Sequence, residues 1–352
     1  MSYSRGSILI NNRDVKIAEI LSRENISVSE FESNTFLFVR DWLQGKDSFT
    51  LQTSGSTGTP KDITLTRNQF TQSARRTLTA LNLDENDTAF VCLDTKYIAG
   101  KMMLVRGLEA NMKIIAVEPS ADPLKNAHEP VSFAALVPLQ LQEILKQSDS
   151  IQKLNGMKAV IIGGGAANTS LQKEIIKLTC SVYATYGMTE TVSHIALQCL
   201  NGPNAADYFT ILPGIKIQTD KRGCLVIGLP EFSNPIVTND LVETISTNQF
   251  RWLGRFDNVI NSGGFKISPE KIEKELENIL PDRAFFMTGI LDERLGEKLV
   301  LIVEGLHREV NFSRLRIHPY EVPKDVIFVP EFVRTQTGKI NREKTMRLLG
   351  IG

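Results

Sequence analysis

The chain has 352 residues, 42% of them hydrophobic and 23% charged, and its 40 Lys and Arg residues balance 40 Asp and Glu residues. This composition is typical of a globular protein large enough for two domains. The zero net charge argues against a nucleic acid partner held by a basic surface. No hydrophobic run reaches the roughly 20 residues that a membrane span needs, and the first residues lead into no signal-peptide core. The four cysteines form no CxxC pair, which predicts reduced, mostly buried thiols in a cytoplasmic protein.

The first two thirds of the chain predict strands that alternate with helices. A strand at 7–11 precedes a helix at 32–44, on which Phe36, Val39 and Leu43 form one hydrophobic face. Thr66 is placed to cap the N-terminus of a helix that runs to about Leu81. Further strands are expected at 49–52, 63–65, 89–93, 113–117, 133–137, 158–162 and 181–185, and further helices at 98–110, 138–148 and 170–179. This order predicts an α/β fold with a mostly parallel sheet and helices on both faces.

The last third of the chain has a different pattern of predicted elements. Residues 214–252 predict short antiparallel strands of a small barrel-like part. Ser268-Pro269-Glu270 then marks the start of a helix that runs to about 280. Strands are expected at 299–304 and 326–329, followed by a basic tail. We therefore predict a large N-terminal domain at 1–256 and a small, mobile C-terminal α+β domain at 257–352.

The segment Thr53–Lys61 lies between two predicted strands and consists, apart from Pro60, of hydroxyl residues, glycines and a lysine. Such a loop suits a polyphosphate, because glycines expose backbone N–H groups while hydroxyls and a lysine add donors and positive charge. Gly55 and Gly58 lack the spacing of the P-loop of NTPases. The sequence thus predicts a different class of phosphate loop, although a Ser- and Gly-rich surface loop has the same composition.

Four further segments follow at the ends of predicted elements. They are Tyr186–Thr191 (YGMTET), Thr238-Asn239-Asp240, Gly254–Ile267 (GRFDNVINSGGFKI) and Arg334–Arg342 (RTQTGKINR). In this order, the five segments resemble the adenylate-forming superfamily of acyl- and aryl-CoA synthetases, luciferases and peptide-synthetase adenylation domains. The resemblance extends from about Leu51 to Arg342. It implies an enzyme that uses ATP and Mg²⁺ to form an acyl-adenylate and then transfers the acyl group to coenzyme A.

The resemblance also implies roles for single residues. The adenine and acyl pockets would be lined by Gly164, Gly165, Tyr186 and Gly187, and the ribose would contact Asp240 and Arg255. The ATP phosphates would contact the loop residues Thr53, Ser54, Gly55, Ser56, Thr57, Gly58 and Lys61. Glu190 would hold Mg²⁺, and Thr189, Glu190 and Lys339 would be the catalytic residues. Asp257 would be the hinge, and Gly263 and Gly264 would lie beside the pantetheine of coenzyme A.

A narrower resemblance concerns the acid. The chain is short for the superfamily, and Tyr97–Met103 (YIAGKMM) together with Tyr186–His194 (YGMTETVSH) is similar to o-succinylbenzoate–CoA ligases of menaquinone synthesis, in the shortened form of Bacteroidetes-type bacteria. That resemblance implies a small aromatic dicarboxylic acid as substrate. Lys101, Arg106 and His194 are our candidates for holding the second carboxylate, and a homodimer could cover apolar surface left by the shortened front.

Several alternatives stay open at this stage. The enzyme could act on another aryl or acyl acid or charge a carrier protein, and the chain could also be a nucleotide-binding protein without turnover. Lys101 could extend along a helix face, His194 could be a packed histidine, and Arg255 could form a local ion pair with Asp257. Lys339 could lie in an exposed loop without a catalytic role.

Overall fold

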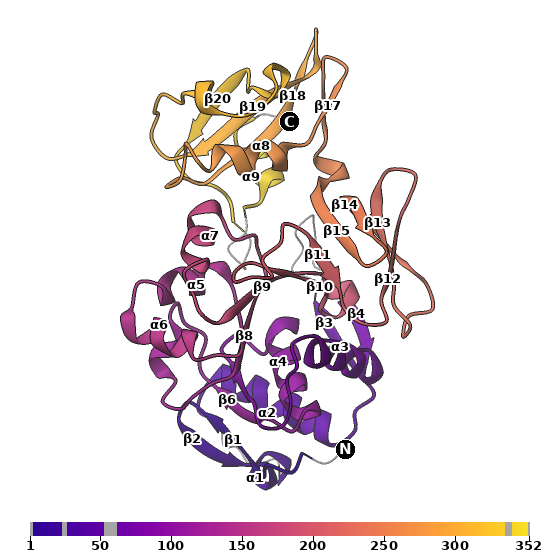
Figure 1. The fold of residues 1–352 in the computed structure, drawn as a ribbon, viewed down its shortest axis with the longest axis vertical. Helices are drawn as coiled ribbons and strands as arrows, with labels where there is room; N and C mark the ends of the chain where they lie inside the picture. The colour runs from indigo at the N-terminus through magenta and orange to yellow at the C-terminus, as the bar shows by residue number, and fades with distance from the viewer. Residues whose placement is uncertain (1–2, 23–26, 53–61, 335–339, 351–352) are drawn as a thin grey trace.

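The computed structural model describes residues 3–22, 27–52, 62–334 and 340–350 of the chain. A large sheet with its helices occupies the lower part of Figure 1, and a smaller sheet with two helices lies above it. The large sheet has 13 strands in the order β12-β13-β14-β15-β11-β10-β9-β8-β7-β5-β6-β1-β2. Helices cover this sheet on both sides, so the predicted α/β class is confirmed. Within the described part of the chain, no helix is both long and apolar enough to cross a membrane.

One half of the large sheet is parallel. Its parallel strands are β1 (Ser7–Ile10), β6 (Lys113–Ala116), β5 (Thr88–Val91), β7 (Phe133–Leu136), β8 (Ala159–Ile162) and β9 (Ser181–Gly187), and β2 (Arg13–Lys16) is the antiparallel edge. On one face lie α2 (Glu30–Leu43), α3 (Arg67–Ala80) and α4 (Ile98–Glu109), and on the other α5 (Pro138–Ile144), α6 (Ser148–Asn155) and α7 (Thr169–Ile175). Because both faces are covered, β7 and β8 are buried along their whole length.

The other half of the large sheet is antiparallel. It consists of β10 (His194–Cys199), β11 (Phe209–Ile211), β12 (Lys216–Thr219), β13 (Cys224–Gly228), β14 (Ile236–Ser246) and β15 (Gln249–Arg255). Strands β12 to β15 are the antiparallel strands expected from residues 214–252, whereas β10 and β11 were not predicted. They continue directly from β9 through β10, so the parallel and antiparallel halves share one row of hydrogen-bonded strands.

A separate hairpin positions the predicted phosphate loop. Its strands, β3 (Ser48–Gln52) and β4 (Asp62–Thr66), pair antiparallel with Gln52 opposite Asp62. Four aromatic rings pack against one another and fix the hairpin to α2 and α3; they belong to Phe38, Trp42, Phe49 and Phe70. Thr66 caps α3 as expected, in a reciprocal capping box with Gln69. The loop Thr53–Lys61 itself lies outside the described residues.

The upper part of Figure 1 contains the second sheet. It is formed by β16 (Ile260–Ser262), β17 (Phe265–Ile267), β18 (Phe285–Asp292), β19 (Gly296–Glu304) and β20 (Asp325–Val329), with the helices α8 (Pro269–Leu276) and α9 (Arg342–Leu348). Hydrophobic clusters separate from those of the large sheet lie around β18 and β19. The sequence signal at Ser268-Pro269 is confirmed as the start of α8, with Pro269 in its first turn.

The structure corrects some predicted boundaries. The helix expected at 138–148 ends at Ile144 as α5, and an unpredicted helix, α6, begins at Ser148. Helix α6 is held by contacts far away in the sequence, since Ser150 Oγ donates to Asp122 Oδ2 over 2.7 Å and Lys153 Nζ donates to the Leu124 carbonyl over 2.8 Å. Strand β9 extends beyond the predicted end at 185 to Gly187, because the unpredicted strand β10 pairs with it.

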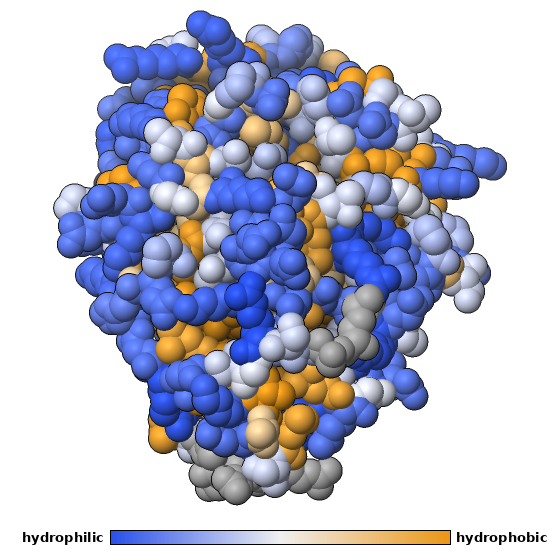
Figure 2. All heavy atoms as spheres, turned by 60° about the horizontal axis from the view of Figure 1, so that its bottom comes forward, coloured by the Kyte–Doolittle hydropathy of each residue, from blue (hydrophilic) through white to orange (hydrophobic). Residues whose placement is uncertain are grey.

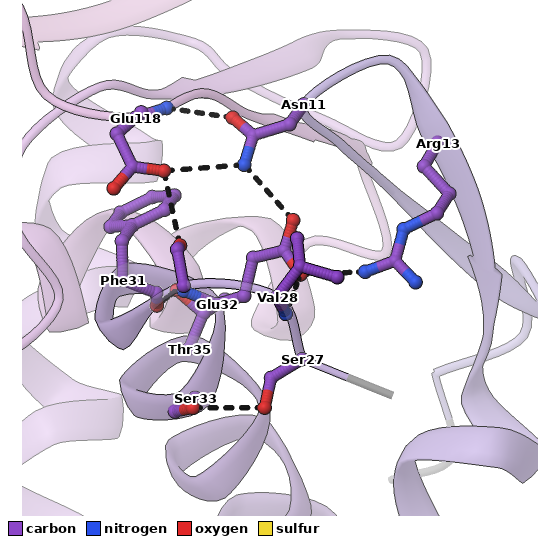
Figure 3. A network of polar contacts seen from close by, with 10 residues as sticks. Asn11, Arg13, Ser27, Val28, Phe31, Glu32, Ser33, Thr35 and Glu118 are labelled. Carbon is purple, nitrogen blue, oxygen red and sulfur yellow. Dashed lines mark hydrogen bonds and ion pairs between the residues drawn. The ribbon is translucent and has the colours of Figure 1, made fainter. Parts of the chain in front are cut away.

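The edge hairpin β1–β2 is tied to the body of the protein by the buried carboxylate of Glu32, which is only 1% exposed (Figure 3). This carboxylate accepts hydrogen bonds from Asn11 Nδ2 (3.0 Å), Arg13 (2.6 Å) and the Val28 amide (2.9 Å). Asn11 also accepts a hydrogen bond from the Glu118 amide over 2.9 Å. The network therefore joins the β1–β2 turn, the start of α2 and the segment after β6.

The lower face of the protein is shown in Figure 2. Hydrophobic side chains reach the surface there in separate groups between charged ones. Leu21, Val28 and Leu37, in and around α1 (Ile17–Ser22) and α2, are among the exposed large hydrophobic residues of the protein. The homodimer suggested from the sequence stays a prediction.

Candidate active site

The predicted site residues come from several elements. Thr53, Ser54, Gly55, Ser56, Thr57, Gly58, Lys61 and Lys339 lie outside the described residues. The others are described, and most of them lie at or just beyond the carboxyl ends of β8 and β9 or on the neighbouring antiparallel strands. This is the edge at which ligands bind in open parallel sheets.

The glycine segment after β8 passes close to its neighbours. Gly164 has a φ of +81°, which favours glycine, and a side chain there would meet Val137. A side chain on Gly163 would lie 2.8 Å from the Thr185 hydroxyl, which itself donates to the Ile162 carbonyl over 2.9 Å. Gly164 and Gly165 are exposed, so their backbone is accessible to a planar ligand at the end of the strand.

Tyr186 and Asp240 form a short polar contact at the site. The Tyr186 hydroxyl donates to Asp240 Oδ2 over 2.6 Å, and Trp252 Nε1 donates to Oδ1 of the same carboxylate over 3.1 Å. The Asp240 amide donates to Thr238 Oγ1 over 3.0 Å. Burial and the neighbouring Asp240 carboxylate raise the pKa of Tyr186. The phenol therefore stays protonated and works as a donor that orients Asp240.

Arg255 lies opposite Asp240 on the paired strands β14 and β15. Its guanidinium makes a two-pronged contact with Asp257, at 2.8 Å and 2.6 Å. The hydrogen bond from Arg255 holds the pKa of Asp257 below its ordinary value. The local ion pair considered from the sequence is thus present, and Asp257 lies in the short turn Phe256–Asn258 between the two sheets.

The turn after β9 reverses the chain, so that β10 pairs antiparallel with β9. A side chain on Gly187 would lie 2.4 Å from the His194 Cα, so only glycine allows β10 to pair this closely. The 3-10 turn Thr189–Thr191 leaves Glu190 exposed, whereas Thr191 is buried and donates to the Ser193 carbonyl. Glu190 therefore projects from a rigid turn at the sheet edge.

Directly behind this turn lies a buried arginine. Arg106, on α4, is 1% exposed, yet the described residues offer it no carboxylate partner within ion-pair distance. Its guanidinium donates to Ser193 Oγ over 2.9 Å and contacts Met103 Sδ at 3.7 Å, while its Nε has no hydrogen-bond acceptor among the described residues. Burial lowers the pKa of Arg106 to about 9. A buried cation without a counter-ion is costly unless a ligand supplies one.

His194 lies next to this guanidinium. Its Nε2 is 3.0 Å from the Thr77 hydroxyl on α3, and its Nδ1 is 3.4 Å from Ser193 Oγ. Burial, and secondarily the charge of Arg106, lower the pKa of His194 well below its ordinary value. His194 is therefore a neutral ring near pH 7. The structure thus brings two of the three candidate acid-binding residues together.

Lys101, the third candidate, has other contacts. Its ammonium group donates to the carbonyls of Thr95 and Lys96, both over 2.7 Å, and lies 5.7 Å from the centre of the Phe38 ring. Burial lowers the pKa of Lys101 to about 8. These contacts fix the segment before α4, and a role of Lys101 in acid binding stays a prediction.

Gly263 and Gly264 form the turn of the β16–β17 hairpin. Both have positive φ, +58° and +83°, as a tight two-residue hairpin turn requires. The opposite end of the hairpin contacts the large sheet, since Ser268 Oγ donates to the Leu253 carbonyl over 3.1 Å. In Figure 1, α8 and α9 lie on the side of the small sheet that faces the large one, and β17 lies toward the outer end. The place of the two glycines beside coenzyme A stays a prediction.

Sequence reasoning missed Trp252, Ser193 and Thr77. Trp252 carries a signal that could have been used, since it is one of only two tryptophans and lies three residues before Arg255 on the same strand. No sequence signal pointed to Thr77, because its contact with His194 depends on how α3 packs against β10.

The described residues contain no cluster of three or more metal-ligating side chains. Mg²⁺ is commonly held by one or two carboxylates together with substrate phosphates and water. Glu190, exposed at the sheet edge, is the acid that could contribute such a ligand.

Comparison with known proteins gives consistent matches. Residues 11–220, more than half of the chain, match the AMP-binding enzyme family. A 2-succinylbenzoate–CoA ligase of Bacillus cereus is 26% identical over 340 residues, which cover 85% of this chain and 69% of that enzyme. The ligase of the same name from Escherichia coli is 26% identical over 309 residues, covering 83% and 66%.

Solved structures of acyl-CoA synthetases are also similar to this chain. A crystal structure from Dyadobacter fermentans, described as an acyl-CoA synthetase (AMP-forming)/AMP-acid ligase II-like protein, is 42% identical, with a TM-score of 0.65 over 94% of this chain and 97% of that one. The o-succinylbenzoate CoA synthetase of Bacillus subtilis in complex with ATP and magnesium is 22% identical, with a TM-score of 0.70 over 84% and 69%. The second match shows a shared fold.

Proposed function

The chain belongs to the family of AMP-binding enzymes and is an adenylate-forming acid–CoA ligase, and from this premise we propose that its acid is o-succinylbenzoate. The acid's carboxylate would attack the α-phosphorus of ATP, so that pyrophosphate leaves and an acyl-adenylate forms. The thiolate of coenzyme A would then attack the acyl carbon, and AMP would leave. The product, o-succinylbenzoyl-CoA, would serve menaquinone biosynthesis.

The nucleotide would lie at the carboxyl ends of β8 and β9. Gly164 and Gly165 expose their backbone there, Gly187 lets β10 pair closely with β9, and Asp240, oriented by Tyr186, would offer a carboxylate to ribose hydroxyls. Glu190 would hold Mg²⁺, which would neutralise charge on the phosphates. Thr53–Lys61 would contact the phosphates that leave, because β3 and β4 hold the ends of that loop.

One observation carries the choice of acid: Arg106 is a buried cation that lacks a counter-ion among the described residues. A monocarboxylic acid would lose its only negative charge in the reaction and leave this cation uncompensated. A dicarboxylic acid keeps one carboxylate for Arg106 while the other reacts. Neutral His194 and Ser193 beside the guanidinium could donate further hydrogen bonds to that carboxylate. The two Bacillus proteins named above, which bear the name of this acid, agree with the proposal.

We further propose that residues 257–352 form a small domain that turns about Asp257. Its separate hydrophobic clusters and the single chain crossing near 257 support this division. Lys339 would stabilise the first step, in which two anions approach each other. Rotation would then replace Lys339 by Gly263 and Gly264 beside coenzyme A.

The experiment is a two-stage assay with a panel of acids. With ATP, Mg²⁺ and o-succinylbenzoate we expect pyrophosphate release, and addition of coenzyme A should give an aromatic thioester. The panel includes the same skeleton without its ring carboxylate, as well as simple aryl and acyl acids. Thioester formation with a monocarboxylic acid but not with o-succinylbenzoate would refute the proposal that o-succinylbenzoate is the substrate. Absence of pyrophosphate release with every acid would refute the ligase itself.

A further inference from the structure

Helix α8 bridges the small and large sheets (Figure 1). Near its start, Ser268 donates to the Leu253 carbonyl of β15. Gly254, on the same strand, has no room for a side chain, which would lie 2.5 Å from Glu270 Oε2. This end of α8 lies close to Asp257, so it moves little if the small domain turns there.

The far end of α8 makes a second contact with the large domain. Glu277, the residue that ends the helix, accepts two hydrogen bonds at one oxygen, Oε2: from the Thr169 amide at 2.5 Å and from the Thr169 hydroxyl at 2.6 Å. Thr169 is the first residue of α7, and both residues are partly buried. The carboxylate thus meets the positive end of a helix and two convergent donors.

The segment before Thr169 is the one that carries Gly164 and Gly165. It runs from the end of β8 to Asn168, whose side chain caps α7 by accepting from the Leu171 amide over 2.8 Å. A contact at Thr169 therefore restrains the start of α7 and the glycine segment next to it. It also depends on the orientation of the small domain, because Glu277 and Thr169 belong to different sheets.

We infer that Glu277 is a positioning residue for the first half-reaction. Its contact with Thr169 holds the small domain in the orientation that turns α9, which follows the predicted catalytic Lys339 in the chain, toward the large sheet. The same contact fixes the segment of Gly164 and Gly165. Rotation to the thioester-forming orientation breaks both hydrogen bonds. This inference rests on the proposed two-step function, but its structural part can be tested without any acid.

The variants can be matched closely. Glu277→Gln keeps the shape and removes the charge. Thr169→Pro removes both donors, and proline is favoured at the first position of a helix. The preceding Asn168 has φ −67° and ψ 166°, a conformation that a following proline permits. Glu275→Gln is the control, since that carboxylate lies on the same helix and makes no side-chain hydrogen bond or ion pair with another described residue.

The first measurement is the distance between spin labels at Gln147→Cys and Glu293→Cys, two exposed positions, in a Cys199→Ser background. We expect one main distance in the otherwise unchanged protein and in Glu275→Gln. Glu277→Gln and Thr169→Pro should each change the ratio of two distances by about tenfold, as for the loss of one charge-assisted hydrogen bond. Unchanged distances in both variants would overturn the inference.

The second measurement separates the half-reactions. Adenylation, followed as pyrophosphate release, should slow several-fold in Glu277→Gln, whereas thioester formation from supplied acyl-adenylate should be unchanged or faster. Glu277→Gln should have no further effect in the Thr169→Pro background, because the contact is already absent. Equal slowing of both steps, or additive effects, would contradict a positioning role. If no acid is a substrate, the distance measurement still decides the structural part while the proposed function fails.

Discussion

The sharpest test of the acid-binding proposal is Arg106→Met. Methionine has a similar length and lies naturally beside Met103, so it fills the same buried space between α4 and the turn after β9. It removes the cation and the hydrogen bond to Ser193. The substitution therefore separates two explanations of Arg106, as an anion-binding residue and as a residue that stabilises the fold.

The expected size of the effect follows from the burial of Arg106. Hydrogen bonds to a charged group contribute about 1.5–3 kcal/mol, so kcat/KM for o-succinylbenzoate should fall roughly 10- to 150-fold. The stability of the ligand-free protein should not fall, because the described residues give Arg106 no carboxylate partner that would be left behind. Removing an uncompensated buried charge should instead raise stability by about 1 kcal/mol or more, which is roughly 2–4 °C in Tm.

The assay compares o-succinylbenzoate with the same skeleton lacking its ring carboxylate. The unsubstituted enzyme should prefer the dicarboxylic acid, and Arg106→Met should lose that preference while its KM for ATP stays the same. Arg106→Lys, which keeps the charge but not the two-pronged geometry, should be intermediate. Unchanged discrimination between the two acids, or a fall in Tm of several degrees, would refute the reasoning.

Three further outcomes are expected. Tyr186→Phe removes the 2.6 Å hydrogen bond that orients Asp240, so KM for ATP should rise about five- to tenfold; an unchanged nucleotide affinity by calorimetry would speak against a ribose role. Lys339→Ala should abolish adenylation and spare thioester formation from supplied acyl-adenylate, and equal loss in both half-reactions would contradict domain rotation. The hydrogen bonds from Arg334 hold the pKa of Glu304 below its ordinary value of 4.5, so the stability that Glu304 contributes is complete above pH 4.5 and lost as pH falls through its folded pKa. Glu304→Gln should therefore make the free energy of unfolding depend less on pH in the acid range. An unchanged dependence would show that the Glu304–Arg334 ion pair does not contribute to stability.

Local patterns were sufficient for much of the fold. Hydrophobic periodicity located the helices α2, α3 and α4, and the alternation of strands with helices indicated the parallel half of the sheet. Thr66 and Pro269 marked helix starts through chemistry that operates within a few residues, whereas the Ser268 hydroxyl, expected as an N-cap, donates to the Leu253 carbonyl. The separation of α5 from α6 was missed, because α6 is held by Asp122 and Leu124 far away in the sequence.

The sequence by itself determined the family and predicted a set of site residues, since the glycines and polar groups of such a site occur in short motifs of fixed order. Only the tertiary structure decided which of them can act together. Arg106 and His194 are 88 positions apart and meet because α4 packs beneath the turn after β9, whereas Lys101, near them in sequence, is bound to backbone carbonyls. Charge compensation across a buried site depends on packing in three dimensions, and no local pattern records it.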